Sequence, residues 1–294
     1  MKNTIVNHKK MEPYKWLLDP PPQSGSEANG SYRPHYGDIT ELNSHRVILD
    51  SVGIETLKKI AEDSIDLLGS SVAIYELNGD YAFGMFSSGW CRMLDAASRK
   101  LCKTDDNREA LACGRWLCHE NCWNDSAKAA IESGQSTDIK CIGGINLYGE
   151  PIYAGGKVIG AINIGYGSPP TDPHCLKELS EKFAIELNEL EQQARRYNPR
   201  PQLLIDLAKK RLQVSARIIG ELVEKATLQA ELKRKSALLD DTNRMARVGG
   251  WELDADSLKV TWTAETYRIH ELPFDYTPGL EEAISFFHPD DRPR

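Results

Sequence analysis

The sequence predicts an α+β fold in which an antiparallel sheet has flanking helices, followed by a long linker helix and an incomplete second module. Three observations predict this class. Apolar strands come in hairpin pairs, and hairpins build antiparallel sheets. Stretches with helical periodicity precede, separate and follow the hairpins, so helices must cover the sheet. A helical pattern of about 40 residues then leads to a final segment with strands of its own.

Residues 1–44 form a predicted flexible leader. They contain few periodically spaced apolar residues and include the run Asp19-Pro20-Pro21-Pro22, followed by Gln23-Ser24-Gly25-Ser26. Proline fixes φ and glycine frees the backbone, so neither a helix nor a strand is expected to persist there.

The first predicted helix starts near Asp50 and precedes a hairpin. Gly69 is placed to cap the C-terminus of this helix. Residues 72–75 are typical of a strand, Asn78-Gly79-Asp80 of a tight turn, and residues 81–86 of the returning strand. The apolar face of the helix consists of Ile54, Leu57, Ala61, Ile65 and Leu68.

Further helices and a second hairpin complete the predicted sheet. Residues 90–102 and 116–133 have helical patterns, and the second of these ends at Gly134. Residues 148–154 and 158–165 are strands joined by a glycine turn. One more helix follows, and its inward face is predicted to be Leu179, Phe183, Leu187 and Leu190.

Residues 204–242 predict a single helix of roughly 60 Å, far longer than a small domain needs for packing on itself. We expect this helix to pair in parallel with a second copy, as a homodimer. The alternative is a helix folded back on the first domain. A seven-residue apolar seam consists of Leu204, Leu207, Val214, Ile218, Leu228, Leu232 and Leu239, and it is interrupted by Arg211, Glu221, Lys225 and Lys235.

The last segment begins a new module at residue 245. Trp251 and Leu253 alternate with polar residues as in a strand, and residues 260–262 are expected to pair back onto them. Two short helical patterns follow. A two-stranded hairpin is marginal alone, so only part of a domain is predicted here.

Composition and charge exclude several classes of protein. The net charge is −7, which disfavours a nucleic-acid partner, because a phosphate footprint needs clustered Lys and Arg. No run of about 18 apolar residues exists to span a membrane, and the N-terminus lacks the apolar stretch of a secretory signal. We therefore expect a cytoplasmic protein without a membrane span.

Cysteines cluster in the middle of the chain. Without an export signal, the seven cysteines are expected to be thiols. Cys118 and Cys122 share a helix face, Cys113 lies five residues before them, and Cys141 is expected to open the next strand. Such a set could bind zinc or another soft metal. The alternative is that these thiols are small apolar side chains in a core or a ligand pocket.

Aromatic residues accompany the cysteines, and together they predict a small, largely apolar ligand cavity. No catalytic residue is predicted. The candidate ligand-binding residues are Phe83, Phe86, Trp90, Cys91, Trp116, Cys118, Cys122, Cys141 and Tyr148, and the candidate metal ligands are Cys113, Cys118, Cys122 and Cys141.

Several motifs resemble the PocR sensory domain. They are Cys118-His119-Glu120-Asn121-Cys122-Trp123, Cys141-Ile142-Gly143-Gly144-Ile145, Glu150-Pro151-Ile152, and the run from Gly155 to Gly167. The likeness covers residues 47–197. It implies a PAS/GAF-like fold and a small organic ligand, such as a simple diol, in proteins that include histidine kinases and transcription regulators.

Residues 246–292 are similar to the first half of a PAS domain, with its Gly-Gly-Trp-Glu strand and its His-Pro-Asp-Asp-Arg ending. Both resemblances together imply four parts: a leader (1–44), a sensory domain (45–198), a signalling helix (199–244) and half of a PAS domain (245–294). This order is that of a sensor histidine kinase, whose kinase or other output domain would lie downstream.

The expected function is therefore a ligand-sensing input region that transmits occupancy through a dimeric helix. One alternative is a cysteine-based metal or redox sensor. Another is a thiol reductase of the kind found on GAF-like folds, with Cys118 and Cys122, or Cys91 and Cys141, as its reactive pair.

Overall fold

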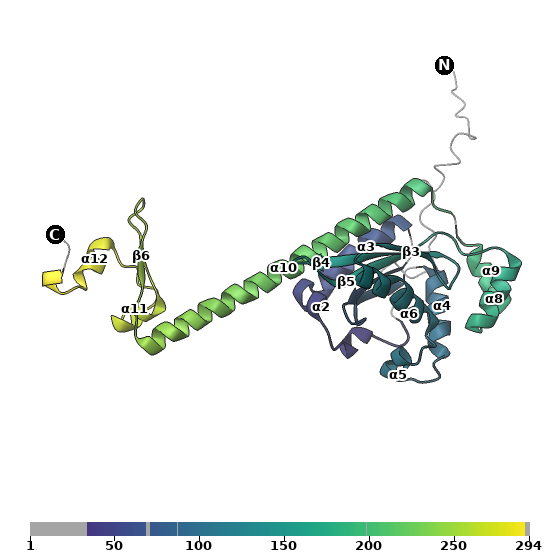
Figure 1. Ribbon diagram of the computed structural model, residues 1–294, viewed down its shortest axis with the longest axis horizontal. Coiled ribbons are helices and arrows are strands. Elements are labelled where there is room, and N and C mark those ends of the chain that lie inside the picture. The colour runs from purple at the N-terminus through teal and green to yellow at the C-terminus, as the bar shows by residue number, and fades with distance from the viewer. Residues whose placement is uncertain (1–33, 69–70, 87, 198, 292–294) are drawn as a thin grey trace, which may run out of the picture. The chain divides into compact units, whose positions relative to one another are not determined.

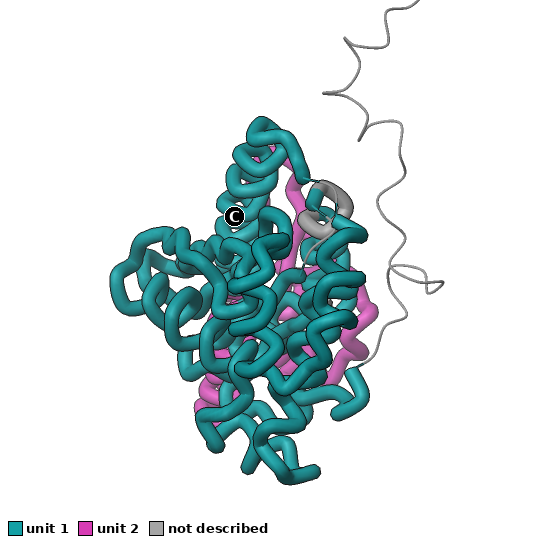
Figure 2. Tube along the Cα trace, turned by 90° about the vertical axis from the view of Figure 1, so that its right-hand side faces the viewer, with its two compact units in different colours: residues 1–226 teal, residues 227–294 magenta. Residues whose placement is uncertain are grey.

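A five-stranded antiparallel sheet in the order β2-β1-β5-β4-β3 is the centre of the first unit of the described chain. The computed structural model describes residues 34–68, 71–86, 88–197 and 199–291, without the side chains of residues 64–67 and 85–86. The chain divides into two compact units, residues 1–226 and 227–294, which Figure 2 colours separately. The strands are β1 (Ser71–Glu76), β2 (Tyr81–Phe86), β3 (Thr137–Lys140), β4 (Asn146–Ala154) and β5 (Lys157–Tyr166).

Both predicted hairpins are confirmed. β1 and β2 pair across the turn at Asn78-Gly79-Asp80, and β4 pairs with β5 across Gly155-Gly156, whose φ angles are both positive. Glycine takes such angles without steric cost, so a tight hairpin turn forms there. The α+β class predicted from these hairpins is therefore the observed one.

A β-bulge in the first hairpin decides which side chains share a face. Ile74 pairs with Phe83 and Tyr75 pairs with Tyr81, so Ala82 is the extra residue on β2. Tyr81 and Tyr75 therefore lie on one face of the sheet. Phe83 lies on the other face with Ile74.

Helices cover both faces (Figure 1). On one face lie α2 (Val47–Val52), α3 (Ile54–Leu68) and the first half of α10 (Gln202–Ala246). The other face packs against the helical run that begins with α6 (Leu117–Glu120). α4 (Gly89–Lys100), α8 (Pro173–Phe183) and α9 (Leu187–Ala194) share a separate apolar cluster, and the short α5 spans Asn107–Ala112.

Two predicted helices differ from the structure in detail. The predicted helix from Asp50 is two helices, because Gly53 adopts a φ of 82° between α2 and α3. Its predicted cap, Gly69, lies outside the described residues, as does the side chain of Ile65. The predicted helix with Leu187 inward is also two helices, separated by Ala184 in the left-handed conformation. Leu187 starts α9 and is exposed, so its predicted burial is wrong.

The first half of α10 is docked on the sheet. Seven of its residues are buried against β-strand and α3 side chains: Ile205, Ala208, Leu212, Ala216, Ile219, Gly220 and Val223. The alternative of a helix folded back on the first domain therefore describes this half of α10. The reason is a second apolar stripe, offset from the seven-residue seam, that recurs every three or four residues.

The N-terminal segment before α2 lies on the first unit. The short 3₁₀ helix η3 (Ile39–Leu42) begins at Asp38, whose carboxylate accepts a hydrogen bond from the Thr40 N–H. Residues 1–33 of the predicted leader lie outside the described chain.

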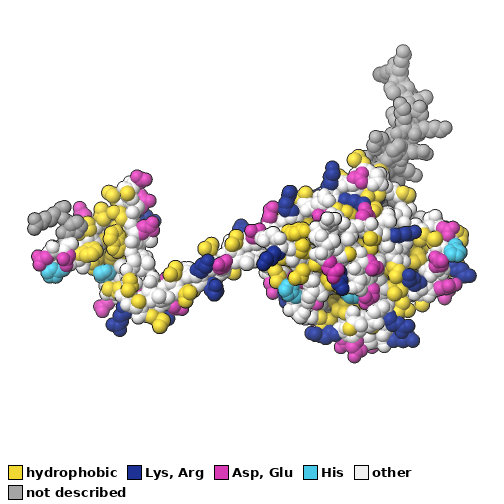
Figure 3. Space-filling view, in the orientation of Figure 1, with side chains coloured by type: hydrophobic (Ala, Val, Ile, Leu, Met, Phe, Trp, Pro, Cys, Tyr) yellow, Lys and Arg dark blue, Asp and Glu magenta, His cyan; other side chains and the backbone are white. Residues whose placement is uncertain are grey.

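The second unit has a two-stranded sheet, β6 (Trp251–Leu253) and β7 (Val260–Trp262), followed by α11 (Ala264–Ile269) and α12 (Leu280–Ser285). This confirms the predicted hairpin. Apolar side chains gather on the visible face of this unit in Figure 3. They border a groove of about 620 Å³ lined by residues that include Trp251, Trp262 and Phe286. Among the described helices, none has the length and apolar character needed to cross a bilayer.

Replacing Gly220 with alanine tests the docking of α10. A Cβ at this position would lie 1.8 Å from the main-chain oxygen of Tyr153. In an exposed helix the change Gly→Ala stabilises by about 1 kcal/mol. Here we expect Gly220→Ala to lower the free energy of unfolding by about 1–3 kcal/mol, measured by urea denaturation. Glu221→Ala, on the adjacent exposed position, is the control and should be nearly neutral; stabilisation by Gly220→Ala would contradict the docked geometry.

Candidate ligand cavity

A π-helical segment faces the sheet on the side opposite α10. α6 continues without a break into η4 (Asn121–Lys128), a π-helix, and then into α7 (Ala129–Ser133). The run ends at Gly134 in the left-handed conformation, as predicted. The helix predicted over residues 116–133 is thus observed, with its middle in the π-helical form. π-helical segments are rare and occur frequently at functional sites.

Side chains of the sheet account for the π-helix. Asn163 on β5 donates through Nδ2 to the main-chain oxygen of Cys122 at 3.0 Å, and Thr137 on β3 donates to that of Ser126 at 3.2 Å. A side-chain donor competes with the helical N–H group for the same main-chain oxygen. The regular hydrogen bond is displaced, and the helix widens at that point. Gly149 on β4 permits this close approach, since a Cβ there would lie 2.6 Å from the hydroxyls of Ser126 and Thr137.

A further side chain ties η4 to the turn after β3. Asn121 accepts from the Ile142 N–H at 2.9 Å and donates to Asp125 at 2.6 Å. Cys141 belongs to this turn, where its main-chain oxygen accepts from Gly144. The prediction that Cys141 opens a strand is therefore wrong: β3 ends at Lys140, and the turn needs Gly144 at a φ of 84°.

A small cavity lies between η4 and the sheet. Its free volume is about 10 Å³, which is about the room that one water molecule needs. The wall combines small and apolar side chains with a few polar groups, as in binding pockets. The lining residues are Ser71, Val72, Ala73, Tyr75, Tyr81, Cys118, His119, Cys122, Leu147 and Asn163.

The polar groups of the cavity form a hydrogen-bonded chain. The Tyr75 hydroxyl donates to the Tyr81 hydroxyl at 3.1 Å, and Tyr81 lies 2.9 Å from Nδ1 of His119. Burial lowers the pKa of His119 to about 4 and raises the pKa values of both tyrosines. His119 is therefore neutral at pH 7, and its Nδ1 shares one hydrogen bond with the Tyr81 hydroxyl, in which the tautomer of His119 sets the donor.

Four thiols surround this region, and burial raises the pKa of each. The pKa of Cys141 reaches about 12, and those of Cys91, Cys118 and Cys122 are also raised. A nucleophilic or metal-binding cysteine must be a thiolate. These protonated thiols therefore disfavour thiol-reductase chemistry.

Cys113 does not join these cysteines. It is the C-cap of α5, and its thiol interacts with Cys102. No group of three or more His, Cys, Asp or Glu side chains in the described ranges is arranged to hold a metal ion. A metal site at Cys113, Cys118, Cys122 and Cys141 stays a prediction that this arrangement does not support.

The predicted ligand-binding residues are divided between the two faces of the sheet. Cys118 and Cys122 line the cavity. Phe83 and Tyr148 belong to the apolar cluster on the α10 face. Cys91 lies beside the cavity wall, where its sulfur accepts a hydrogen bond from Ser71 at 3.5 Å.

The other predicted residues lie around the cavity. Trp90 is fully buried in the cluster of α4, α8 and α9, which Cys141 also contacts, and its Nε1 donates to the Gly143 oxygen at 2.9 Å. Trp116 precedes α6, with its ring centroid 5.8 Å from that of His119. The Phe86 side chain lies outside the described part of the chain.

Tyr75, Tyr81, His119 and Asn163 were not among the predicted site residues. His119 stands inside the Cys118-to-Trp123 motif, so the motif was the signal that could have found it. Strand alternation would have placed Tyr75 and Ala73 on one face. The bulge at Ala82 disrupts that alternation in β2, so Tyr81 could not be assigned in the same way.

Asp95 lies behind Trp116 and is 2% exposed. Its carboxylate accepts from the Trp116 indole at 2.7 Å and from the Tyr36 hydroxyl at 2.8 Å. Burial raises the pKa of Asp95 to about 6, although both hydrogen bonds and the nearby Arg99 oppose the rise.

Comparison with known proteins gives one match. The family model for the sensory domain found in PocR matches residues 50–224. No curated protein and no solved structure matches the chain.

Asp95 should make stability depend on pH. Its folded pKa of about 6 exceeds the ordinary 3.8, so the folded protein keeps a proton that the unfolded chain has released. The contribution of Asp95 to the free energy of unfolding is complete below about pH 4. It falls by about 3 kcal/mol as the pH rises through 6. Asn accepts from Trp116 and donates to Tyr36, so Asp95→Asn should fold and lose this decline. Urea titrations between pH 4 and 7 measure it, with the exposed Asp105→Asn as control; an unchanged slope in Asp95→Asn would refute the assignment.

Proposed function

The chain belongs to the family of sensory domains found in PocR and is therefore a signal-sensing input region, and we propose that it senses a small organic ligand bound between η4 and the sheet. The observation that carries this proposal is the cavity itself. It combines apolar walls with the oriented polar groups of Tyr81, His119 and Asn163. Such a mixture suits a compact molecule with one or two hydrogen-bonding atoms.

The cavity is closed in the described form, so binding requires η4 to move away from the sheet. The ties that hold it to the strands include single hydrogen bonds from Asn163 and Thr137 to main-chain oxygens. Those oxygens have alternative donors within a regular helix, which lowers the cost of releasing them. A ligand that satisfies Asn163 would therefore favour the open form.

The two faces of the sheet provide a route from the cavity to α10. On β4, Leu147 lines the cavity, while its neighbour Tyr148 points to α10 and accepts a hydrogen bond from Gln213 at 2.8 Å. On β5, Asn163 stands between Ile162 and Ile164, both packed in the α10 cluster. A shift of either strand thus acts directly on α10.

A polar contact reinforces the docking of α10. The Lys209 ammonium pairs with the Asp138 carboxylate and donates to the Tyr166 hydroxyl at 3.1 Å, while that hydroxyl donates to the same carboxylate at 2.6 Å. The ammonium also lies 4.2 Å from the centroid of the Tyr166 ring and 5.2 Å from that of Tyr148. These contacts join α10 to β3, β4 and β5. Coupling of about 1–3 kcal/mol between the cavity and α10 would be typical.

α10 also carries an apolar stripe that its own chain leaves exposed, which supports a parallel homodimer. The stripe follows the seven-residue seam, and its members are between 42% and 67% exposed. They are Leu207, Val214, Ile218, Leu228, Leu232 and Leu239. Pairing with a second copy buries them, whereas the docked stripe stays on the sheet.

The output of this input region is proposed to be a kinase or another signalling domain that follows the PAS-like second unit, in a cytoplasmic protein. The support is the order of the parts: sensory domain, helix and PAS-like hairpin, as in the proteins that the sequence resembles.

Filling the cavity should abolish ligand binding. Ala73 lines the cavity and is 6% exposed. We expect a three- to six-carbon alcohol or diol to raise the melting temperature of the wild-type protein, in proportion to its concentration above the Kd. Ala73→Leu should remove that rise. Ala154→Leu, on the opposite face, should preserve it; a rise retained in Ala73→Leu would place the ligand elsewhere.

Charges in the exposed stripe should separate the dimer. Leu228→Glu combined with Leu232→Glu places like charges at the pairing surface, so the mass measured by light scattering should fall to that of one chain. Ala230→Glu with Ala237→Glu adds the same charge outside the stripe and should keep the dimer. A wild-type protein that is monomeric at all concentrations would remove the dimer from the proposal.

A further inference from the structure

An open polar cleft lies on the surface next to the closed cavity. Its volume is about 570 Å³, large enough for a small organic molecule. Four segments form it: η3 and the residues after it, the β1–β2 turn, the end of α5, and the helical run from His119 to Asn124. Its surface offers hydrogen-bonding groups of Asn43, Arg108 and Glu120 beside the indole of Trp123.

Tyr81 and His119 are the two described residues that line both the cleft and the cavity. Their side chains are joined by the 2.9 Å hydrogen bond, and their ring centroids lie 5.6 Å apart. This pair is therefore the partition between an open space that can receive a molecule and a closed one that holds about one water.

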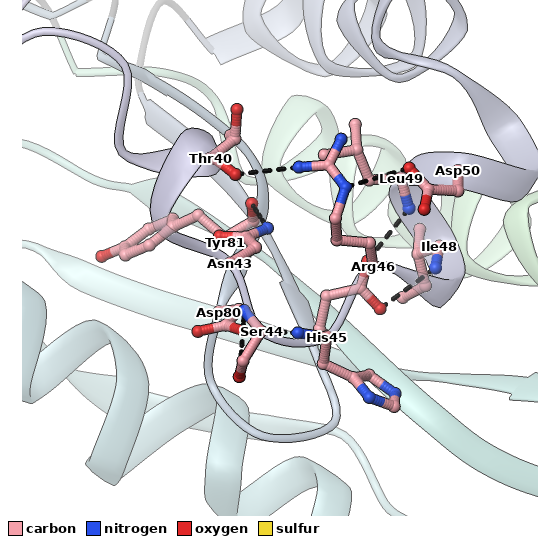
Figure 4. A network of polar contacts seen from close by, with 11 residues as sticks. Thr40, Asn43, Ser44, His45, Arg46, Ile48, Leu49, Asp50, Asp80 and Tyr81 are labelled. Carbon is pink, nitrogen blue, oxygen red and sulfur yellow. Dashed lines mark hydrogen bonds and ion pairs between the residues drawn. The ribbon is translucent and has the colours of Figure 1, made fainter.

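The main chain on the Tyr81 side of the partition is held firmly. Asn43 donates to the Tyr81 oxygen at 2.8 Å, and Asp80 accepts from the N–H groups of Ser44 and His45 at 2.7 and 2.9 Å (Figure 4). Burial alone would raise the pKa of Asp80, but these hydrogen bonds and one from Asn78 lower it, so the carboxylate stays charged. Opening must therefore come from the Tyr81 ring or from the His119 helix.

The groups behind the partition are all uncharged. His119 is neutral and both tyrosines are protonated, as are the thiols of Cys118 and Cys122, and Asn163 is an amide. An ion would lose its hydration there without a counter-charge, at a cost of many kcal/mol. A molecule that passes the partition is therefore uncharged.

We propose that the cleft is the access site for an uncharged ligand and that the Tyr81–His119 hydrogen bond is the gate to the cavity. This inference rests on the proposed ligand-sensing function, because it assigns the route to the same cavity. The gate gives the order of events: the molecule is first held in the cleft and is then admitted as the pair separates, while the movement of η4 away from the sheet makes room for it.

The native cysteines allow a test that needs no knowledge of the ligand. Cys118 and Cys122 lie behind the gate, and Cys175 on α8 lies outside the described lining of both spaces. Methyl methanethiosulfonate is small and uncharged; a thiolate attacks its sulfenyl sulfur, forms a methyl disulfide and releases methanesulfinate. Labelling rates at pH 8.5 are measured for each cysteine by peptide mass spectrometry.

Tyr81→Phe removes the gate hydrogen bond and should raise the labelling rates of Cys118 and Cys122 about fivefold, the equivalent of one hydrogen bond. The rate of Cys175 should stay unchanged. Tyr75→Phe is the matched control, because it removes a buried hydroxyl and leaves the Tyr81–His119 contact in place. Unchanged rates at Cys118 and Cys122, or an equal rise at Cys175, would overturn the gate.

A second pair of variants separates gating from loss of packing. His119→Ala removes both the ring and the acceptor, whereas His119→Gln restores an acceptor for Tyr81. Labelling of Cys118 should be faster in the alanine variant and close to wild type in the glutamine variant; equal rates in both would overturn the gate. If an alcohol or diol stabilises the protein but no gate variant changes the labelling rates, the ligand enters by another route and the gate is overturned. If the variants change the labelling rates but no alcohol or diol raises the melting temperature, the gate stands and the proposed ligand sensing is refuted.

Discussion

The hydrogen bond from Asn163 to the main-chain oxygen of Cys122 is the interaction on which the site depends. It fixes the height of the helical run above the sheet and, with the Thr137 contact to Ser126, diverts two carbonyls from their regular partners. The run is π-helical at this point, and Cys118, His119 and Cys122 line the cavity between it and the sheet. Asn163 is 2% exposed, so its amide has to be satisfied by protein atoms or by a bound molecule.

One sheet serves two partners because adjacent residues of a strand point to opposite faces. The same stretches of β4 and β5 hold cavity residues on one face and α10 contacts on the other. A sensor needs such a connection, since a ligand can shift an equilibrium only by interacting differently with two states. α10 offers those states: one apolar stripe is docked on the sheet, and another is exposed for a partner helix.

Much of this arrangement could be predicted from sequence. Turn glycines and alternating apolar residues located both hairpins, and the cysteine-rich motif pointed to the helix that covers the cavity. The site residues were harder to assign. Phe83 and Tyr148 are aromatic residues near the motif in sequence, yet they face α10, because a bulge and the strand register decide the face. His119 and Asn163 escaped prediction because their importance lies in partners far away along the chain.

The sequence alone determined the α+β class, the order of the elements and the membership in a sensory family, because these depend on local periodicity, turn chemistry and motif spacing. Tertiary structure alone decided that the central helix is π-helical, that α10 docks with half its length, and that burial raises the pKa values of Cys118 and Cys122. Each of these results from a long-range contact: a sheet amide meeting a helix carbonyl, a second apolar stripe finding the sheet, and burial withdrawing thiols from water.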